Sequence, residues 1–334
     1  MFEWLDPNNM IINLVVLVIG FVALIKGADI FVDGASDIAA RLGVSGLVIG
    51  LTVVAMGTSA PELSVSVSAA LSGSNAIAIS NVVGSNIFNA LIILGVCALM
   101  KPVPVMQDIK KRDFPVLLFA GLLLVFFSGF YILFGPKPDM SAGGDIAGQL
   151  FRVGGIIFLL VFIGYMIYTV RDAKKKQQKD ESYEPQPLWK SVLFILLGIA
   201  CIVVGGDGIV TSAKNLAIMW GMSETLVGLT IVAFGTSLPE LVTSIVASAK
   251  GQNDMAMGNV IGSNIFNILL ILGVSSSIKP IPVTVDSFID ATMMFGVSVI
   301  AYIFACTGKK FSRIEGGILV LVYAGYMTYA ILRQ

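Results

Sequence analysis

The stretch LTVVAMGTSAPEL at Leu51–Leu63 returns as LTIVAFGTSLPEL at Leu229–Leu241, with ten of thirteen positions identical. A second stretch, NVVGSNIFNALIILGV at Asn81–Val96, returns as NVIGSNIFNILLILGV at Asn259–Val274, with thirteen of sixteen identical. Both pairs are separated by 178 residues. The chain therefore contains an internal duplication. A repeat of this length is the first guide to the architecture, ahead of the individual helices.

The duplication extends beyond these two motifs. The same offset pairs Gly27 with Gly205, Asp29 with Asp207, and Lys101–Pro102 with Lys279–Pro280. Further along, GYMIY at Gly164–Tyr168 matches GYMTY at Gly325–Tyr329 with an offset of 161. The second copy has thus lost 17 residues, and we assign the loss to the loop Gly135–Gln149.

Composition places the chain in a membrane. Of its 334 residues, 56% are hydrophobic and 13% are charged, about half the usual share of charged residues, and the mean hydropathy is +0.91. The 21 basic and 21 acidic residues balance, so no nucleic-acid partner is indicated. Histidine does not occur, which excludes histidine triads and imidazole metal sites. Cys97, Cys201 and Cys306 lie far apart and indicate neither a disulfide framework nor a metal site.

Ten segments are long and apolar enough to cross the hydrocarbon core as helices. They lie near 11–36, 44–71, 76–99, 114–134, 151–170, 190–214, 223–249, 255–278, 287–306 and 314–332. They do not alternate in polarity as the strands of a β-barrel would. The first ten residues carry Glu3 and Asp6 and no basic residue, so they are not expected to be a cleavable signal peptide. The predicted fold is an all-α polytopic membrane protein.

The basic residues predict the orientation. With the N-terminus outside, 15 of the 21 lysines and arginines fall in loops on the cytoplasmic side, as the positive-inside rule requires. After ten spans the C-terminus is then also outside. The expected organisation is a first five-helix repeat at 1–171, a cytoplasmic linker at 172–189 and a second repeat at 190–334, placed in the cytoplasmic (inner) membrane.

Each half holds an odd number of spans, so the second copy must enter the membrane from the opposite side. Inverted repeats with a site at their interface are typical of secondary transporters. The sequence therefore predicts a transporter rather than an enzyme. An ancestral duplication without a function would not explain why the most similar segments are polar ones. Because the paired site is complete in one chain, a monomer is expected to suffice.

Glu62 and Glu240 lie within otherwise apolar spans at positions related by the repeat. An intramembrane carboxylate is costly and indicates function by default. On a continuous helix Thr58 and Ser59 would share a face with Glu62, and Thr236 and Ser237 would do so with Glu240. Pro61 and Pro239 lack the N–H that would bond the carbonyls of Gly57 and Gly235, so these carbonyls need another partner. A cation is one such partner, although each proline could also mark a plain kink.

A second set of oxygens comes from the GSNIFN motifs, which supply Ser85 with Asn89 and Ser263 with Asn267. By themselves these are small-residue packing motifs. Together with the glutamates they form an inventory of carboxylate, hydroxyl, amide and backbone oxygens without nitrogen or sulfur ligands. Such hard donors suit Ca²⁺ and Na⁺ and disfavour zinc, copper and iron. The ions are expected as transported substrates, and no cofactor is indicated.

These motifs resemble the α-repeats of the calcium/cation antiporter superfamily, specifically its sodium/calcium exchanger branch in the prokaryotic form. The resemblance covers essentially the whole chain, because both motifs occur twice in the expected order. It implies antiport by alternating access, with Na⁺ moving inward and Ca²⁺ outward across a site at the membrane midplane. Charge arithmetic favours three Na⁺ for one Ca²⁺, because two glutamates balance one Ca²⁺ and leave three Na⁺ with one net charge.

The resemblance also implies individual roles. Glu62 and Glu240 would be the central calcium ligands, assisted by the carbonyls of Thr58 and Thr236. An outer sodium site would use Glu62, Ser85, the Ala233 carbonyl, Thr236 and Ser237, and its inner counterpart Glu240, Ser263, the Ala55 carbonyl, Thr58 and Ser59. Asn89 and Asn267 would line the middle of the site. The spans that carry Asp29 and Asp207 would slide across the other eight.

One position departs from part of the family. Potassium-dependent relatives carry Asp where this chain has Asn267, so the resemblance here is to potassium-independent members. Three alternatives remain open at this point. A proton/calcium antiporter would use the same glutamates, a calcium channel would conduct without a counter-ion, and an intramembrane hydrolase would use the glutamates as acid and base. Of these, the proton/calcium antiporter is the nearest alternative.

Overall fold

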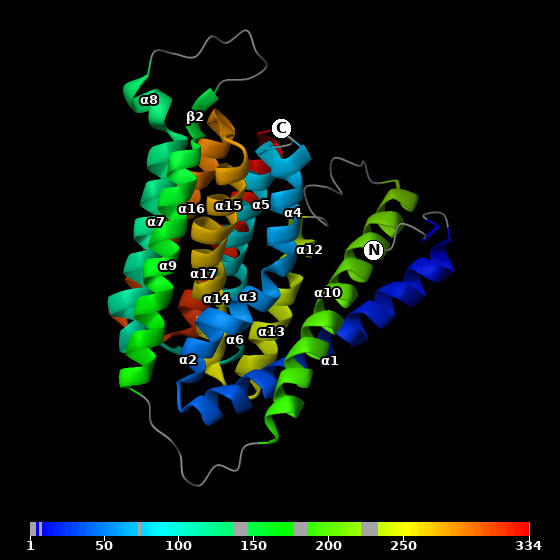
Figure 1. Ribbon diagram of the computed structural model, residues 1–334. Coiled ribbons are helices and arrows are strands. Elements are labelled where there is room, and N and C mark those ends of the chain that lie inside the picture. The colour runs from blue at the N-terminus through cyan, green and yellow to red at the C-terminus, as the bar shows by residue number, and fades with distance from the viewer. Residues whose placement is uncertain are drawn as a thin grey trace. The chain divides into compact units, whose positions relative to one another are not determined.

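The computed structural model of the protein (Figure 1) describes residues 5, 6, 9–72, 75–135, 146–176, 186–221 and 233–333. The first four residues, most of the loop 135–149, the middle of the linker 172–189 and the start of the predicted span 223–249 lie outside these ranges. The described residues divide into two compact units. Unit 1 comprises 1–61 and 173–259, and unit 2 comprises 62–172 and 260–334. Each unit therefore combines segments of both sequence repeats.

Apolar helices dominate the described chain. Seven of them are long and apolar enough to cross a membrane, and the bent pair Gly46–Thr58 and Ala60–Leu71 would make an eighth span. The predicted span at 114–134 contains two shorter helices, α7 (Phe114–Ser128) and α8 (Phe130–Phe134). The described part of the span at 223–249 contains α13 (Leu238–Ala249). The protein is thus a polytopic helical membrane protein, and the total of ten spans stays a prediction.

Unit 1 is built around two long helices, α1 (Met10–Leu42) and α10 (Leu188–Met219), which lie side by side (Figure 1). Its other elements are α2 (Gly46–Ile49), the π-helical turn η1 (Gly50–Val54), α3 (Ala55–Thr58), α12 (Ala233–Gly235), α13 and the first part of α14 (Asn253–Phe266). Lys250, the residue after α13, bonds the carboxylates of Asp29 and Asp33 on α1 at 2.7 and 2.6 Å. Burial lowers the pKa of Lys250, but these two carboxylates outweigh burial and raise it overall. Lys250 therefore stays charged and ties α13 to α1.

Glycines let α1 and α10 approach closely in an antiparallel arrangement. A methyl group on Gly20 would lie 2.9 Å from the Gly205 carbonyl oxygen, and one on Gly27 would lie 3.0 Å from that of Gly198. The repeat offset of 178 relates Gly20 to Gly198 and Gly27 to Gly205. The two contacts are therefore equivalent under the repeat. This exchange of partners is the pattern of a two-fold axis between the helices.

Buried polar pairs follow the same two-fold relation at the two ends of the helix pair. Asn215 donates to the Asn13 side chain at 2.9 Å, and Ser191 donates to the Asp37 carboxylate. The offset relates Asn13 to Ser191 and Asp37 to Asn215, so the two hydrogen-bonded pairs occupy equivalent positions in the repeat. Packing by small residues with a few hydrogen bonds is how helices associate in lipid, where burying apolar surface supplies little driving force.

Unit 2 contains the remaining helices, with α7 packed against α16 (Val285–Thr307) and α6 (Leu94–Met100) packed against α17 (Arg313–Leu332). It further contains α4 (Ala60–Ser72, from Glu62 on), α5 (Asn75–Phe88), η2 (Asn89–Ile93), η3 (Ile109–Asp113), α8, α9 (Arg152–Lys175), the second part of α14, η6 (Asn267–Ile271) and α15 (Leu272–Ile278). Helix α5 with η2 and α6 matches α14 with η6 and α15 residue for residue at the offset of 178.

Four short strands also occur in unit 2 and were not predicted. β1 (Val103–Pro104) pairs with β4 (Lys310–Phe311), and β2 (Ile146–Leu150) pairs with β3 (Ile281–Thr284), both antiparallel. β1, β3 and β4 each follow a helix end, and β2 directly precedes α9. They join the two sequence halves through backbone hydrogen bonds that hydropathy does not predict.

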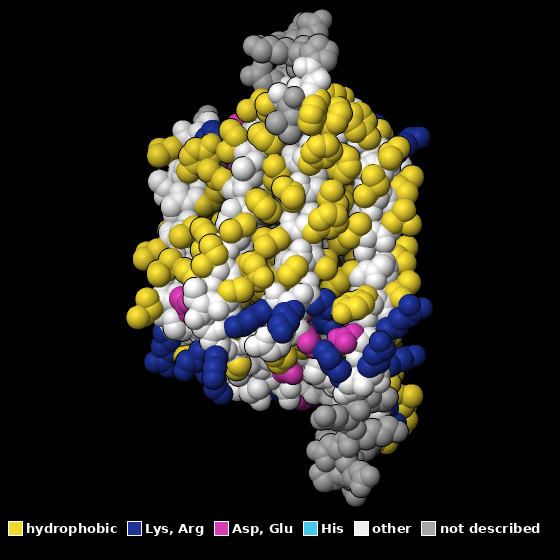
Figure 2. Space-filling model, turned by 90° about the vertical axis from the view of Figure 1, so that its left-hand side faces the viewer, with side chains coloured by type: hydrophobic (Ala, Val, Ile, Leu, Met, Phe, Trp, Pro, Cys, Tyr) yellow, Lys and Arg dark blue, Asp and Glu magenta, His cyan; other side chains and the backbone are white. Residues whose placement is uncertain are grey.

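The outer faces of the helices are apolar. Large hydrophobic side chains on α9 such as Leu160 (63% exposed) and on α1 such as Ile19 (61% exposed) face outward, as expected when the solvent is lipid. Figure 2 shows the face formed by α7 and α9 covered with hydrophobic side chains, with lysines and arginines gathered in a band at its lower edge. A band of this kind is typical of the boundary between hydrocarbon and lipid headgroups.

Candidate functional site

The repeated GTS-x-PE motifs each form a broken helix. Helix α3 ends at Thr58, and α4 begins at Ala60 after a bend of 50° at Ser59. In the second copy α12 ends at Gly235, and α13 begins at Leu238. The structure thus differs from the continuous helix on which a shared face was predicted. The reason is the proline, which has no N–H for the preceding turn and is well tolerated in the first turn of a new helix.

The break places each glutamate in the first turn of its helix. Glu62 lies in the first turn of α4 and Glu240 in that of α13, and both are 0% exposed. The unpaired N–H groups of a helix N-terminus carry partial positive charge, which stabilises a carboxylate nearby. The helix ends therefore make two deeply buried carboxylates tolerable.

In unit 1 the first-copy motif contacts the second-copy glutamate. Ser59 Oγ donates a hydrogen bond to Glu240 Oε1 at 2.7 Å, although the two residues are 181 positions apart, and both side chains are fully buried. Both residues belong to the predicted inner sodium site. The structure therefore brings together a hydroxyl from one repeat and a carboxylate from the other.

Asn259 holds this half of the site in place. Its Nδ2 donates to the backbone carbonyl of Glu240 at 3.3 Å and to Ser244 Oγ at 2.9 Å. Its Oδ1 accepts from Thr58 Oγ1 at 3.1 Å. One amide thus links the turn that carries Glu240 to the predicted ligand Thr58.

In unit 2 the same construction surrounds Glu62. Ser85 Oγ donates to Glu62 Oε1 at 3.4 Å, which brings together two members of the predicted outer sodium site. Asn81, which is related to Asn259 by the offset, donates to the Glu62 carbonyl at 3.3 Å and to Ser66 Oγ at 3.0 Å. Each glutamate therefore has one asparagine that anchors its backbone to the following helix.

Four asparagines form a reciprocal network in unit 2. Asn86 and Asn264 each donate to the other's backbone carbonyl, at 3.1 and 3.3 Å. Asn89 donates to Asn264 Oδ1 at 3.0 Å, and Asn267 donates to Asn86 Oδ1 at 2.9 Å and to Ser85 Oγ at 3.2 Å. Asn89 and Asn267 are the first residues of the π-helical turns η2 and η6. π-Helical turns of this kind occur frequently at functional sites.

Several buried oxygens of the predicted ligands have no hydrogen-bond partner within the described residues. They are Glu240 Oε2, Ser263 Oγ, Asn89 Oδ1 and Asn267 Oδ1. A buried acceptor without a partner costs about 1–3 kcal/mol, so such atoms need an explanation. Carboxylate, hydroxyl and amide oxygens are the ligands that Na⁺ and Ca²⁺ take. The donor set therefore fits a hard cation as the transported substrate.

The other predicted ligands lie in the same segments. Ala55 is in α3, and its carbonyl accepts the Ser59 N–H at 3.0 Å and the Thr58 hydroxyl at 3.4 Å. Ala233 begins α12, whereas Thr236 and Ser237 lie between α12 and α13, where Ser237 is buried and Thr236 half-buried. Asp29 and Asp207 lie on α1 and α10. Within the described residues no group of three Asp, Glu, His or Cys side chains could hold a metal, so hydroxyls and amides are needed to complete a cation site.

Sequence reasoning missed Asn81, Asn259, Asn86 and Asn264 as residues of the site. The signal was present, because each asparagine is identical in the two copies of the NV-x-GSNIFN motif. Helical spacing from Ser85 and Ser263 points to Asn89 and Asn267 on the same face and not to these four residues. The four amides act instead through backbone carbonyls and through one another, which spacing along one helix does not indicate.

Comparisons with known proteins show which family the chain resembles. Residues 12–171 and 190–332 match the model of the sodium/calcium exchanger protein family. The sodium/calcium exchanger MaX1 of Methanosarcina acetivorans is 35% identical over 341 residues, covering 95% of this chain and 97% of that protein. The inner membrane protein YrbG of Escherichia coli is 35% identical over 333 residues, covering 96% of each.

A solved structure of the sodium–calcium exchanger NCX_Mj is also similar, at a TM-score of 0.80 and 29% identity. The match covers 95% of this chain and 98% of that one. The family model, the relatives and the solved structure thus agree over nearly the whole length. This chain belongs to the sodium/calcium exchanger protein family.

Proposed function

We propose that this protein is a secondary active antiporter that moves Na⁺ inward and Ca²⁺ outward by alternating access. Membership of the exchanger family supports this function, as do the names of MaX1 and NCX_Mj, each described as a sodium/calcium exchanger. The donor chemistry also supports it, because buried carboxylate, hydroxyl and amide oxygens suit these two ions.

The hydrogen bond between Ser59 and Glu240 carries the proposal. It joins a hydroxyl of the first GTS-x-PE motif to the carboxylate of the second at 2.7 Å. A polar contact between the two repeats at membrane depth is expected where inverted repeats build a substrate site. We infer that both glutamates serve one shared site, in which Na⁺ and Ca²⁺ compete.

The proposed ligand sets follow the two repeats. Glu62 and Glu240 bind Ca²⁺ together with the carbonyls of Thr58 and Thr236. One sodium site uses Glu62, Ser85, the Ala233 carbonyl, Thr236 and Ser237, and the other uses Glu240, Ser263, the Ala55 carbonyl, Thr58 and Ser59. Asn89 and Asn267 contribute amide oxygens, for which the partnerless Oδ1 atoms are available.

Charge balance then sets the coupling. Two ionised glutamates neutralise one Ca²⁺, whereas three Na⁺ leave one positive charge. An occupied site can cross the low-dielectric region, but two bare carboxylates pay the full cost of burial without a partner. This difference prevents the empty protein from changing sides, which is what obligatory exchange requires. We therefore propose electrogenic exchange of three Na⁺ for one Ca²⁺.

The proposal includes the arrangement in the membrane. Ten helices form two inverted repeats, with both termini outside and the linker 172–189 in the cytoplasm. The exchange of contacts between α1 and α10 under the offset of 178 supports the inversion. The basic residues support the orientation, and the relative YrbG, named an inner membrane protein, supports that location. One chain carries all the proposed ligands and can act as a monomer.

The glutamates provide the direct test. We expect Glu62→Gln and Glu240→Gln each to abolish ⁴⁵Ca²⁺ uptake driven by a sodium gradient in liposomes, because each removes one of the two charges that hold Ca²⁺. Glu315→Gln, at a half-buried carboxylate in the capping box of α17, is the carboxylate control and should transport normally, because glutamine also serves at this capping position. Uptake by either site variant near the wild-type rate would reject the assignment.

The same liposomes distinguish the alternative counter-ion. Without sodium, a pH gradient should drive little ⁴⁵Ca²⁺ uptake if Na⁺ is the coupling ion. Strong uptake under these conditions would identify a proton/calcium antiporter that uses the same two glutamates. Uptake that needs neither gradient would instead indicate a channel.

A further inference from the structure

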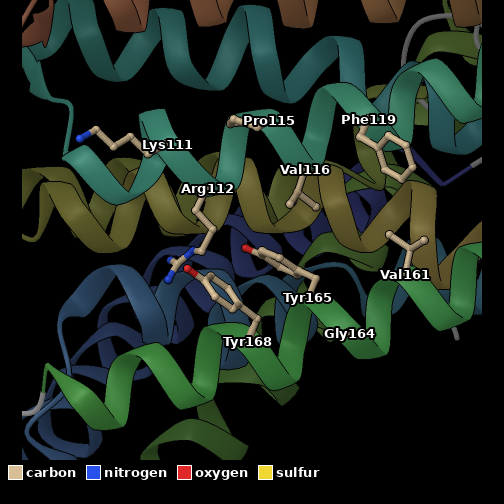
Figure 3. Close-up of a pocket in the computed structure, with 9 residues that line it drawn as sticks. All are labelled: Lys111, Arg112, Pro115, Val116, Phe119, Val161, Gly164, Tyr165 and Tyr168. Carbon is tan, nitrogen blue, oxygen red and sulfur yellow. The ribbon is translucent and has the colours of Figure 1, made fainter.

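A groove lies on the lipid-facing surface of unit 2, between α7 and α9, far along the chain from the GTS-x-PE motifs. It has a volume of about 510 Å³. Figure 3 shows its two ends. One end is apolar and is lined by Val116 and Phe119 of α7 and Val161 of α9, whereas at the other end the Arg112 guanidinium lies near the hydroxyls of Tyr165 and Tyr168. The groove therefore changes from apolar to polar along its length.

Gly164 keeps the middle of the groove open. A methyl group built on this residue would meet no atom within 4 Å. The neighbouring Phe119 and Tyr168 are 50% and 57% exposed, so their rings form the outer walls rather than fill the space. A slot of this kind, open toward the bilayer, can take an acyl chain.

A rigid network forms the floor of the polar end. Arg112 bonds Asp113 at 2.6 Å and Asp172 on α9 at 3.0 Å, and Tyr165 Oη donates to Asp113 Oδ1 at 3.0 Å. These bonds neutralise the charge of Arg112 and join η3, the turn that leads into α7, to α9. Arg112 therefore shapes the groove rather than supplying free positive charge.

Positive charge is supplied around this network. The segments 108–113 and 171–176 together hold seven basic and three acidic residues, namely Lys110, Lys111, Arg112, Arg171, Lys174, Lys175 and Lys176 against Asp108, Asp113 and Asp172. Lys110 donates to the Gly308 carbonyl. Lys111 lines the groove, is exposed, and forms no ion pair with any described residue. Of the two basic residues described in the groove lining, Lys111 is therefore the one available to a ligand, because Arg112 is paired.

The second repeat shows that this lysine is not needed to build the helix pair. The offset of 178 places Asp290 at the position of Arg112, and the offset of 161 places Arg333 at that of Asp172. Arg333 and Asp290 form an ion pair at 2.8 Å. The second repeat therefore has the equivalent of the Arg112–Asp172 ion pair, with the two charges exchanged. The position of Lys111, however, is taken by Ile289. The lysine accompanies only the first-repeat groove.

We propose that the groove between α7 and α9 binds an anionic phospholipid. The headgroup phosphate pairs with Lys111 and accepts a hydrogen bond from the Tyr168 hydroxyl, and one acyl chain runs past Gly164 along the wall of Phe119. Basic pockets between membrane helices suit anionic headgroups. A zwitterionic lipid would add its own ammonium group next to the lysines and gain less.

Lipid binding to the full-length protein tests the proposal. The purified protein is equilibrated with mixed vesicles of phosphatidylglycerol and phosphatidylcholine, extracted in mild detergent, and analysed for retained lipid by native mass spectrometry. We expect phosphatidylglycerol to be retained preferentially, and Lys111→Gln to lower its retention by about five-fold, since one basic residue near an anionic surface contributes about that much. Glycerol phosphate alone should not displace the lipid, because it lacks the chain.

Gly164→Leu tests the acyl-chain part, because it puts a side chain into the slot at a position where the added Cβ would meet no atom within 4 Å. Gly325→Leu is the matched control, since Gly325 is the repeat equivalent and its methyl position is also open. Only the first variant should lose the lipid. Equal retention of the two lipids, or retention unchanged in both Lys111→Gln and Gly164→Leu, would overturn the proposal. Should Gly164→Leu fail to elute as a monodisperse species, Gly164→Ala and Lys111→Gln still decide the question.

Discussion

Ser59 Oγ of the first repeated motif donates to Glu240 Oε1 of the second at 2.7 Å, and both side chains are shielded from solvent. Removing the hydroxyl leaves Glu240 Oε1 without its donor, which costs about 1–3 kcal/mol for a buried acceptor. It also removes one of the proposed sodium ligands. We therefore expect Ser59→Ala to raise the sodium concentration needed for half-maximal exchange by about five-fold or more.

The sodium dependence of ⁴⁵Ca²⁺ efflux from liposomes measures this effect. Ser298→Ala is the matched control, because Ser298 is also buried and its hydroxyl bonds the Met294 carbonyl of its own helix. Sodium dependence that is the same in Ser59→Ala and in wild type would remove Ser59 from the site.

Asn267 tests the amide network. Its Nδ2 donates to Asn86 Oδ1 and Ser85 Oγ, and an aspartate at this position has no N–H to donate. Asn267→Asp would therefore set a carboxylate against an amide oxygen and add a third negative charge to the site. We expect the variant to depend on an additional cation, K⁺ or H⁺, for exchange.

Exchange assayed across a series of potassium concentrations and pH values checks this expectation. Asn89→Asp, at the repeat-related position, provides the comparison, since its Nδ2 donates to Asn264 in the same way. An ion profile of Asn267→Asp identical to that of wild type would contradict the role given to this position.

At the level of elements, the glycine contacts of α1 and α10 determine how closely the two helices pack. A methyl group on Gly198 would lie 2.6 Å from Phe31 Cβ and 2.9 Å from the Gly27 carbonyl oxygen, so the helices would have to separate. We expect Gly198→Ala to lower the free energy of unfolding by about 1–3 kcal/mol, the usual cost of overpacking.

Thermal unfolding in detergent measures this loss. Gly296→Ala, in the interior of α16, is the control, because its methyl group would meet no atom within 4 Å and alanine favours helix. A melting temperature of Gly198→Ala at or above that of wild type would show that the helices can separate without cost. In that case the close contact would not define the helix pair.

At the level of the whole molecule, the proposed stoichiometry makes transport sensitive to the membrane potential. One net charge moved per cycle gains about 2.3 kcal/mol per 100 mV. We expect an inside-negative potential, set with potassium and valinomycin, to accelerate sodium uptake coupled to ⁴⁵Ca²⁺ release from the vesicles. The gradient of Ca²⁺ reached at steady state should also rise with the potential. A steady state that does not change with the potential would indicate two Na⁺ for one Ca²⁺.

Much of the protein could be predicted from residue types and spacing alone. The duplication and the class of membrane protein follow from residue patterns, and the role proposed for Glu62 and Glu240 rests on such patterns too. Hydropathy indicates whether a segment enters lipid. A carboxylate that is costly to bury in lipid, and that occurs in both copies, indicates a function. These properties are local, so a linear sequence contains them in full.

Packing decided the rest. The tertiary structure paired Ser59 with Glu240, joined four asparagines into one network, and set α7 beside α9 so that Gly164 opens a groove. In lipid, the buried and the outward faces of a helix are almost equally apolar, so hydropathy does not show which faces meet. That choice depends on small residues and hydrogen bonds between segments far apart in the chain, and it exists only once the helices are packed.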